Sequence, residues 1–196
     1  NLLKNKIIQK SKIKSPLKFD KEKINLINVG RFTDQKDQIT LLKAVKLIKD
    51  KISLQLTIVG RGKEEENLKK FIKNNNLNGL VRLVNFTDNP YNLINSSDIF
   101  VLSSLYEGLP NVLLESQVLK KFIISTDCPT GPKEILMNGK AGFLFKPKDY
   151  RKLGKLIVYA FKNKNKLKKM SNLGYKNLFR FDYNTNTKKY YSTINS

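Results

Sequence analysis

Residues 99–115 read IFVLSSLYEGLPNVLLE, an apolar run, a glycine turn and a second apolar stretch. The first four residues, Ile99 to Leu102, are typical of a buried strand in a parallel sheet. Pro110 suits the first position of a helix, where its missing N–H group costs nothing. The stretch therefore predicts a strand, a turn and a helix whose first amides point back toward the strand end. Such a corner favours the binding of anions.

Two carboxylates flank this turn. Glu107 precedes the expected helix, where it would repel a bare phosphate, and Glu115 lies about one turn inside the helix. The pattern fits a ligand with a phosphate at the helix tip and hydroxyl groups near each carboxylate, such as a nucleotide sugar whose ribose diol is bound by Glu115. The alternative is a pair of ordinary surface glutamates, and this spacing alone favours neither reading.

Composition restricts the chemistry. At 196 residues the chain has room for one well-buried domain. It contains no histidine and a single cysteine, so a His-based triad, a zinc site and an internal disulfide are excluded. We interpret Cys128 as a small loop residue rather than a nucleophile, because no histidine can activate it. No apolar run approaches the roughly 20 residues of a membrane span, and the N-terminus lacks a signal-peptide core, which favours a cytoplasmic protein.

The charge is strongly positive, with 38 basic and 16 acidic residues and a formal net charge of +22. The lysines are interleaved along the whole chain, as a compositional bias would leave them, and no nucleic-acid recognition module is visible. We therefore expect no dedicated nucleic-acid partner. A basic nucleotide- or nucleic-acid-binding module without enzymatic activity stays open as an alternative. The charge also favours contact with an anionic membrane surface.

Strand-like and helix-like segments alternate along the chain. We expect strands over residues 24–29, 54–59, 81–86, 99–102, 122–125 and 143–145. We expect helices over residues 38–49, 63–73, 91–96 and 111–119, a short one ending at 137, two more from 149 onward, and a third C-terminal helix over 183–194. This order predicts an α/β fold, a doubly wound parallel sheet of about six strands with extra C-terminal helices.

The same survey suggests three parts. Residues 1–23 show no sustained period and read as a linker or a severed interdomain segment. Residues 24–180 form the expected domain, and residues 181–196 a C-terminal helix. Four polar or glycine-rich loops, 30–36, 60–62, 106–111 and 126–132, follow expected strands. Each loop alone is weak evidence for a binding site. Ligands of such sheets bind at the carboxyl ends of the strands, so the convergence of all four loops there is the stronger argument.

The motifs of this chain resemble the C-terminal half of a retaining GT-B glycosyltransferase of the large group-1 (GT4) family. In chain order they are Val29-Gly30-Arg31 with Lys36, Ile58 to Gly62, Glu107 to Glu115, and Gly139 to Leu144. The resemblance covers about residues 24–191. It implies a Rossmann-like domain that binds a nucleotide sugar, and a second, N-terminal domain that binds the acceptor and toward which the last helix returns.

The resemblance also implies roles for matching residues. Arg31 and Lys36 would hold the donor diphosphate and neutralise the leaving nucleoside diphosphate without a metal, which makes them catalytic together with Glu107, which would face the sugar. Glu115 would bind the ribose. Other donor contacts would come from Gly30, Gly60, Gly62, Gly108, Leu109, Pro110, Asn111 and Val112, and base contacts from Val84, Asn85, Phe86 and Thr87. The alternative for Arg31 and Lys36 is two solvated cations in a lysine-rich protein.

Two departures from the family pattern stand out. Gln117, Lys120 and Phe122 replace the usual small residue, glycine and proline after the second glutamate, so the helix exit and the next strand are expected to shift. The phosphate loop ends in Lys36-Asp37 instead of Lys-Gly. We expect donor binding to survive both changes.

What the resemblance implies overall is a hexosyltransferase-type enzyme. It would move a sugar from a UDP- or GDP-sugar, without a cofactor, to a lipopolysaccharide, a capsule, another surface glycan or a lipid-linked oligosaccharide, as a peripheral protein at the inner membrane face. The chain by itself would be nearly inactive without the acceptor domain. Half of a nucleotide-sugar epimerase is a further alternative. Those enzymes generally need additional catalytic acids and histidine, which this chain lacks.

Overall fold

A computed structural model describes residues 2–182 of the chain. At its centre lies a six-stranded sheet in which all neighbouring strands run parallel, in the order β3-β2-β1-β4-β5-β6. The strands are β1 (Ile24–Val29), β2 (Leu54–Val59), β3 (Val81–Val84), β4 (Ile99–Leu102), β5 (Phe122–Thr126) and β6 (Phe143–Phe145). The strand order reverses between β1 and β4, which confirms the predicted doubly wound α/β fold.

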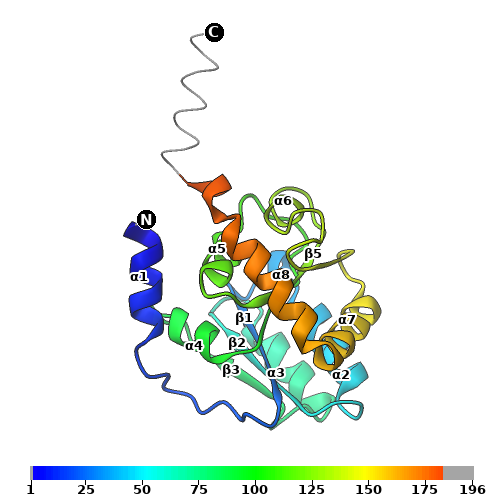
Figure 1. Ribbon diagram of the computed structural model, residues 1–196. Helices are drawn as coiled ribbons and strands as arrows, with labels where there is room; N and C mark the ends of the chain where they lie inside the picture. The colour runs from blue at the N-terminus through cyan, green and yellow to red at the C-terminus, as the bar shows by residue number, and fades with distance from the viewer. Residues whose placement is uncertain (1, 183–196) are drawn as a thin grey trace.

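Helices cover both faces of this sheet (Figure 1). They are α1 (Leu2–Ser11), α2 (Gln38–Ile48), α3 (Glu65–Asn74), α4 (Tyr91–Ser96), α5 (Asn111–Val118), α6 (Pro132–Ile135), α7 (Tyr150–Lys162) and α8 (Lys164–Lys176), with short 3₁₀ turns at Asp34–Lys36 and Leu178–Phe181. Alternate strand residues point to opposite faces. Leu26 packs in a core with α2, α3 and α7, and Ile27 in a second core with α4, α5 and α6.

One helix was not predicted from the sequence: Leu2–Ser11 form α1, which packs against α4 and α5. Three asparagine side chains at the start and along α4 donate hydrogen bonds to carbonyl groups that follow or end α1: Asn89 to Lys10 (3.1 Å), Asn95 to Ser11 (3.4 Å) and Asn92 to Lys14 (3.4 Å). Among residues 3–11, Ile7 is the one almost fully buried apolar side chain. One buried position gives no visible period, so the helix escaped prediction. The interpretation of the segment as an interdomain linker stays a prediction.

Two other boundaries need comment. The third strand was predicted to reach Phe86, but β3 ends at Val84 and the side chains of Asn85 and Phe86 are exposed. Helices α7 and α8 confirm the predicted C-terminal helices. The third helix, predicted over residues 183–194, lies outside the described residues.

Candidate functional site

The candidate site lies where the strand order reverses, at the carboxyl ends of β1 and β4. The helices that follow these strands, α2 and α5, pack on opposite faces of the sheet, and ligands of such sheets bind at this reversal point. Three hydrogen bonds join the two loops: Leu105 N to Gln35 O (2.8 Å), Gln35 Nε2 to Tyr106 O (3.0 Å) and Ser103 Oγ to Lys36 O (2.8 Å). The first loop therefore presents its side chains directly against the second.

Two of the predicted catalytic residues form an ion pair across this junction. Lys36 Nζ lies 2.6 Å from Glu107 Oε1, and the two side chains are only 16% and 7% exposed. The stem of Lys36 passes Gly30, since a Cβ atom at Gly30 would lie 3.6 Å from Lys36 Cδ and Cε. Ser104 Oγ donates to the same Glu107 oxygen at 2.6 Å. A pair so shielded from water is little weakened by salt.

Ser104 was not among the predicted site residues. The sequence offered one sign of its role: Ser104 follows a buried strand closely and precedes Glu107 by three residues.

The loop after β2 is held against the loop after β1 by close backbone contact. A Cβ atom at Gly60 would lie 2.0 Å from Gly30 O, and one at Gly62 would lie 2.3 Å from Phe32 O. Phe32 N donates to Arg61 O at 2.9 Å. Glycine is required at these two positions because any side chain would push the loops apart. The structure therefore brings Gly30, Gly60 and Gly62 together, as predicted from their motifs.

Arg31 stands beside this contact. Gln38 Nε2 donates to Arg31 O at 3.0 Å, which fixes the backbone at this residue. The Arg31 side chain is exposed and has no hydrogen-bond or ion-pair partner among residues 2–182. Its guanidinium is consequently available to a ligand, whereas Lys36 is already paired.

The first turn of α5 borders the site from the other side. Leu109 and Asn111 are exposed, Val112 is partly buried and Pro110 is buried immediately before the helix. Amides in the first turn of a helix have no acceptor within the helix and carry partial positive charge. This arrangement makes the start of α5, together with Gly108, a surface that suits an anionic or hydroxyl-rich ligand.

The loop between β5 and α6 supports that turn. A Cβ atom at Gly131 would lie 2.4 Å from Gly108 O, and Glu107 N donates to Pro129 O at 3.4 Å. The hydroxyl group of Thr130 donates to the carbonyl of Glu107. The fourth predicted loop thus contacts the third one, at Glu107 and Gly108. Thr130 itself was not predicted as a site residue.

Glu115, the second predicted carboxylate, lies within α5 and contacts a tyrosine rather than a lysine. Tyr91, the first residue of α4, donates its hydroxyl group to Glu115 Oε1 at 3.2 Å. Burial raises the pKa of Glu115 above its ordinary value, and the hydrogen bond from Tyr91 opposes this rise. Burial, and then the charge of Glu115, raises the pKa of the Tyr91 hydroxyl. Tyr91 was not predicted as a site residue, although it begins the helix after β3 and therefore lies near the carboxyl ends of the strands.

The residues predicted to contact a base surround the end of β3. Val84 is the last residue of the strand, and Asn85 and Phe86 follow with exposed side chains. The Arg61 guanidinium lies 5.1 Å from the centre of the Phe86 ring, within the range of a cation–π interaction. The hydroxyl group of Thr87 accepts a hydrogen bond from Asn89 N at 3.2 Å. The aromatic ring and its cation thus stand open to a planar ligand.

The two departures from the family pattern have local structural roles. Asp37 caps α2 by accepting bonds from Thr40 N (3.2 Å) and Thr40 Oγ1 (2.7 Å), and burial raises its pKa. Gln117 is buried and donates to Ile135 O at 3.2 Å. The strand β5 begins at Phe122, where the sequence predicted it.

Cys128 is 3% exposed, and burial raises the pKa of its thiol. A raised pKa disfavours the thiolate, which supports its interpretation as a loop residue. Across residues 2–182, no three side chains of histidine, cysteine, aspartate or glutamate gather closely enough to hold a metal ion. No helix in this part of the chain has the length and apolar character that crossing a bilayer requires.

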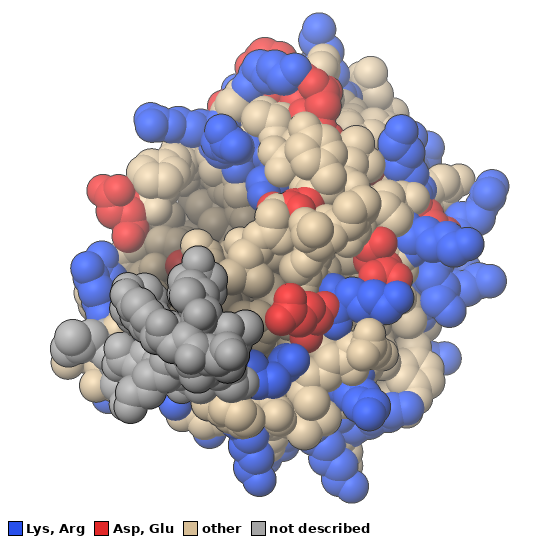
Figure 2. All heavy atoms as spheres, turned by 90° about the horizontal axis from the view of Figure 1, so that it is seen from above, with Lys and Arg blue, Asp and Glu red and all other residues tan. Residues whose placement is uncertain are grey.

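Basic side chains are spread over the surface. Seen from the side of the molecule that carries α6, lysine and arginine side chains stand along much of the outline, with acidic side chains between them (Figure 2). On this face they do not merge into one continuous patch. The distribution agrees with the interleaving of lysines along the sequence.

Comparisons with known proteins agree on one family. The family described as glycosyl transferases group 1 matches residues 9–177. An uncharacterized glycosyltransferase, MJ1059, of Methanocaldococcus jannaschii is 39% identical over 141 residues, which cover 65% of this chain and 35% of that protein. The N-acetylgalactosamine-N,N'-diacetylbacillosaminyl-diphospho-undecaprenol 4-alpha-N-acetylgalactosaminyltransferase of Campylobacter jejuni is 32% identical over 119 residues, covering 61% of this chain and 32% of the relative.

Solved structures share the fold. TarM superposes with a TM-score of 0.82 at 20% identity, over 93% of this chain and 37% of that one. Anabaena HepE in complex with UDP gives a TM-score of 0.80 at 19% identity, over 89% of this chain and 49% of that one. The chain spans about a third of the length of the two curated relatives named above. Because the family match extends over most of its residues, this chain belongs to the group 1 glycosyltransferases, and its sheet and helices form a Rossmann-like domain of the GT-B type.

Proposed function

We propose that this chain binds the nucleotide-sugar donor of a glycosyltransferase that retains the anomeric configuration of the sugar. The observation that carries the proposal is the Lys36–Glu107 ion pair at the reversal point of the sheet. An ammonium group has three donors, and Glu107 occupies one of them, so Lys36 can still bind phosphate oxygens. Glu107 in turn has lone pairs left for sugar hydroxyl groups. In this proposal the Lys36–Glu107 pair binds the phosphate on one side of the scissile bond and the sugar on the other.

Stabilisation of the leaving group would then be the main catalytic contribution of this chain. When the bond between sugar and diphosphate breaks, negative charge grows on the departing nucleoside diphosphate. In this proposal Arg31, Lys36 and the first amides of α5 surround the diphosphate and neutralise this charge without a metal ion. Fixed donors of this kind usually supply the largest single contribution to catalysis, since they need no reorganisation during the reaction.

The nucleoside would extend from the diphosphate toward β2 and β3. In this proposal Glu115 accepts hydrogen bonds from the ribose diol, and the loop of Asn85, Phe86 and Thr87 contacts the base. The structures of HepE with UDP and with UDP-glucose support a nucleoside diphosphate as the ligand of this fold. We propose a UDP- or GDP-sugar as the donor.

The acceptor would be a growing surface glycan or a lipid-linked oligosaccharide. The names of relatives support this class: one acts on a diphospho-undecaprenol-linked sugar, and another belongs to capsular polysaccharide biosynthesis in Staphylococcus aureus. A second, N-terminal domain would bind this acceptor, so we expect the chain alone to bind donor and transfer little sugar. Membership of the family favours neither the nucleic-acid-binding nor the epimerase alternative.

Thermal stability in the presence of nucleotides tests donor binding. A ligand at about 100 times its dissociation constant stabilises the folded state by roughly 2.7 kcal/mol. We expect UDP or GDP, and their sugars, to raise the melting temperature of the chain by several degrees in differential scanning fluorimetry. A panel in which no nucleoside diphosphate raises the melting temperature would overturn the proposal.

Association with membranes would follow from the charge of +22. Each lysine or arginine close to an anionic leaflet contributes about 1 kcal/mol of binding free energy. We expect the chain to float with vesicles that contain phosphatidylglycerol in a liposome flotation assay at physiological salt. Equal flotation with purely zwitterionic vesicles would contradict this part of the proposal.

A further inference from the structure

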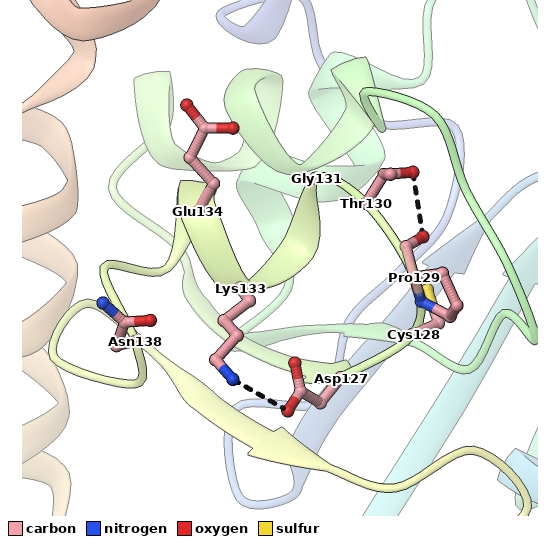
Figure 3. Close-up of a pocket in the computed structure, with 8 residues that line it drawn as sticks. All are labelled: Asp127, Cys128, Pro129, Thr130, Gly131, Lys133, Glu134 and Asn138. Carbon is pink, nitrogen blue, oxygen red and sulfur yellow. Dashed lines mark hydrogen bonds and ion pairs between the residues drawn. The ribbon is translucent and has the colours of Figure 1, made fainter.

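A hollow of about 690 Å³ lies beside the candidate donor site, at the loop between β5 and α6. Its walls include Asp127, Pro129, Thr130, Lys133, Glu134 and Asn138. Figure 3 shows the Lys133 ammonium group pointing toward the Asp127 carboxylate, with Asn138 on the loop beside them, while the Glu134 carboxylate points away. No role in donor binding falls to these residues, and their volume is that of a small-molecule site.

The side chains of the hollow favour a neutral ligand with many hydroxyl groups. Lys133 Nζ lies 3.9 Å from Asp127 Oδ2, a loose ion pair whose members are 62% and 37% exposed. Each member therefore keeps free hydrogen-bonding capacity, and Asn138 adds both a donor and an acceptor. The carboxylates of Asp127 and Glu134 disfavour an anion, and Lys133 disfavours a cation. Vicinal hydroxyl groups, which donate and accept at once, match this mixture.

The position of the hollow relates it to the transfer reaction. The backbone of residues 129–131 separates it from the turn at Gly108, and Glu107 N donates to Pro129 O at 3.4 Å across this thin wall. A second hollow, of about 250 Å³, shares Asp127 and continues along Lys146, Asp149 and Lys152.

We propose that this hollow, centred on Asp127, Lys133 and Asn138, binds a neutral sugar unit of the acceptor glycan. The proposal rests on the proposed function, because it places the acceptor next to the bound donor. The donor sugar itself belongs at Glu107, on the other side of the 129–131 wall. This chain would thus contribute to the choice of acceptor as well as to donor binding.

Saturation-transfer difference NMR can test the proposal with four neutral sugars: the methyl glycosides of glucose, galactose, N-acetylglucosamine and N-acetylgalactosamine. We expect at least one of them to bind, and its signal to persist when UDP and GDP are present at saturating concentration. Methyl glucuronide should bind at least threefold more weakly than methyl glucoside. In the Asp127→Ala/Asn138→Ala double variant the affinity for the sugar should fall at least fivefold, with nucleotide affinity unchanged.

The control is Glu66→Ala, which removes an exposed carboxylate on α3, away from the hollow. Glu66→Ala should keep the melting temperature of the parent. The double variant should melt about 2–4 °C lower, because Asn138 has a φ of 55° that alanine tolerates less well than asparagine, whereas the exposed ion pair of Asp127 contributes little to stability. The inference is overturned if none of the sugars binds, if the double variant binds them as the parent does, or if nucleoside diphosphates displace them. A nucleotide-induced thermal shift in the same sample, with sugar binding absent, would reject this inference and leave the proposed function standing.

Discussion

Two partly buried lysines, Lys121 and Lys36, lie at opposite ends of the parallel strands, here called the amino edge and the carboxyl edge of the sheet. They contact different chemical groups. At the amino edge, Lys121 Nζ donates to the carbonyl groups of Asn95 (2.5 Å) and Ser97 (3.0 Å), which end α4. At the carboxyl edge, Lys36 Nζ pairs with Glu107 at 2.6 Å. Burial lowers the pKa of Lys121, and the nearby charge of Asp98 opposes this change. The same residue type thus meets carbonyl groups at one edge and a carboxylate at the other.

The difference separates a structural cation from one that can serve a ligand. The last carbonyl groups of a helix lack partners and carry partial negative charge, so Lys121 completes the hydrogen bonding of α4. Lys36 instead joins two loops that follow different strands, next to amides and an exposed arginine. We infer that Lys121 contributes to folding and that Lys36 contributes to binding. Each of the following variants tests one side of this comparison.

Lys36→Ala should have the largest effect on ligand binding. Hydrogen bonds to charged groups contribute about 1.5–3 kcal/mol, which corresponds to a loss of roughly 10- to 150-fold in affinity. We expect a loss in this range for UDP or GDP in isothermal titration calorimetry. Lys36→Arg should recover part of the affinity, and the exposed Lys69→Ala should leave it unchanged. An affinity within twofold of the parent would remove Lys36 from the site.

Gly60→Ala should destabilise the carboxyl edge itself. The new Cβ atom would lie 2.0 Å from Gly30 O, so the two loops would have to separate. We expect a loss of about 2 kcal/mol or more in the free energy of unfolding, measured by urea denaturation. Gly108→Ala is the matched control, because a Cβ atom there meets nothing within 4 Å. Equal stability of the two variants would show that the loops are not held in close contact.

Lys121→Met should affect stability and not binding. Methionine keeps the apolar stem, but the carbonyl groups of Asn95 and Ser97 lose their donor. We expect the free energy of unfolding to fall by about 1–2 kcal/mol. The affinity for UDP or GDP should stay within twofold of the parent. A loss of nucleotide affinity comparable to that of Lys36→Ala would erase the distinction between the two edges.

Glu115 should give a smaller, pH-dependent effect. Because its pKa is raised in the folded chain, its contribution to stability is present below the pKa of the unfolded state and is lost as the pH rises through the folded value. Ribose binding needs the carboxylate, so nucleotide affinity should fall on acidification already above the ordinary glutamate pKa. Tyr91→Phe removes a bond that holds this pKa down and should move the midpoint further up. Glu115→Gln should bind nucleotide weakly and without this pH dependence.

The sheet was well predicted from the sequence because its strands are short, mostly apolar runs bounded by polar residues or glycine. The bounds of β1, β2 and β4 agree with the predicted strands residue by residue. Helix α1 was missed because Ile7 is the single deeply buried apolar residue among residues 3–11, and carboxamide contacts hold the end of the helix and the segment after it. Hydrogen bonds between distant segments leave no periodic trace in a sequence.

The sequence predicted which loops form the candidate site, but not which side chains contact one another within it. Parallel strands place the loops that follow them at one edge, so Gly30, Gly60 and Glu107 could be grouped from the sequence. The Lys36–Glu107 pair and the Tyr91–Glu115 bond depend on the conformation of each loop and helix start, which the residue types do not determine. The hollow at Asp127 arises from a turn between β5 and α6 whose shape no motif encodes.

The most direct test of the account compares a nucleoside diphosphate with its nucleoside, UDP with uridine and GDP with guanosine, by isothermal titration calorimetry. If Arg31, Lys36 and the start of α5 receive the diphosphate, at least one diphosphate should bind tenfold or more tightly than its nucleoside, and Lys36→Ala should abolish most of that advantage. Equal affinities within each pair, or an advantage that survives Lys36→Ala, would contradict the account.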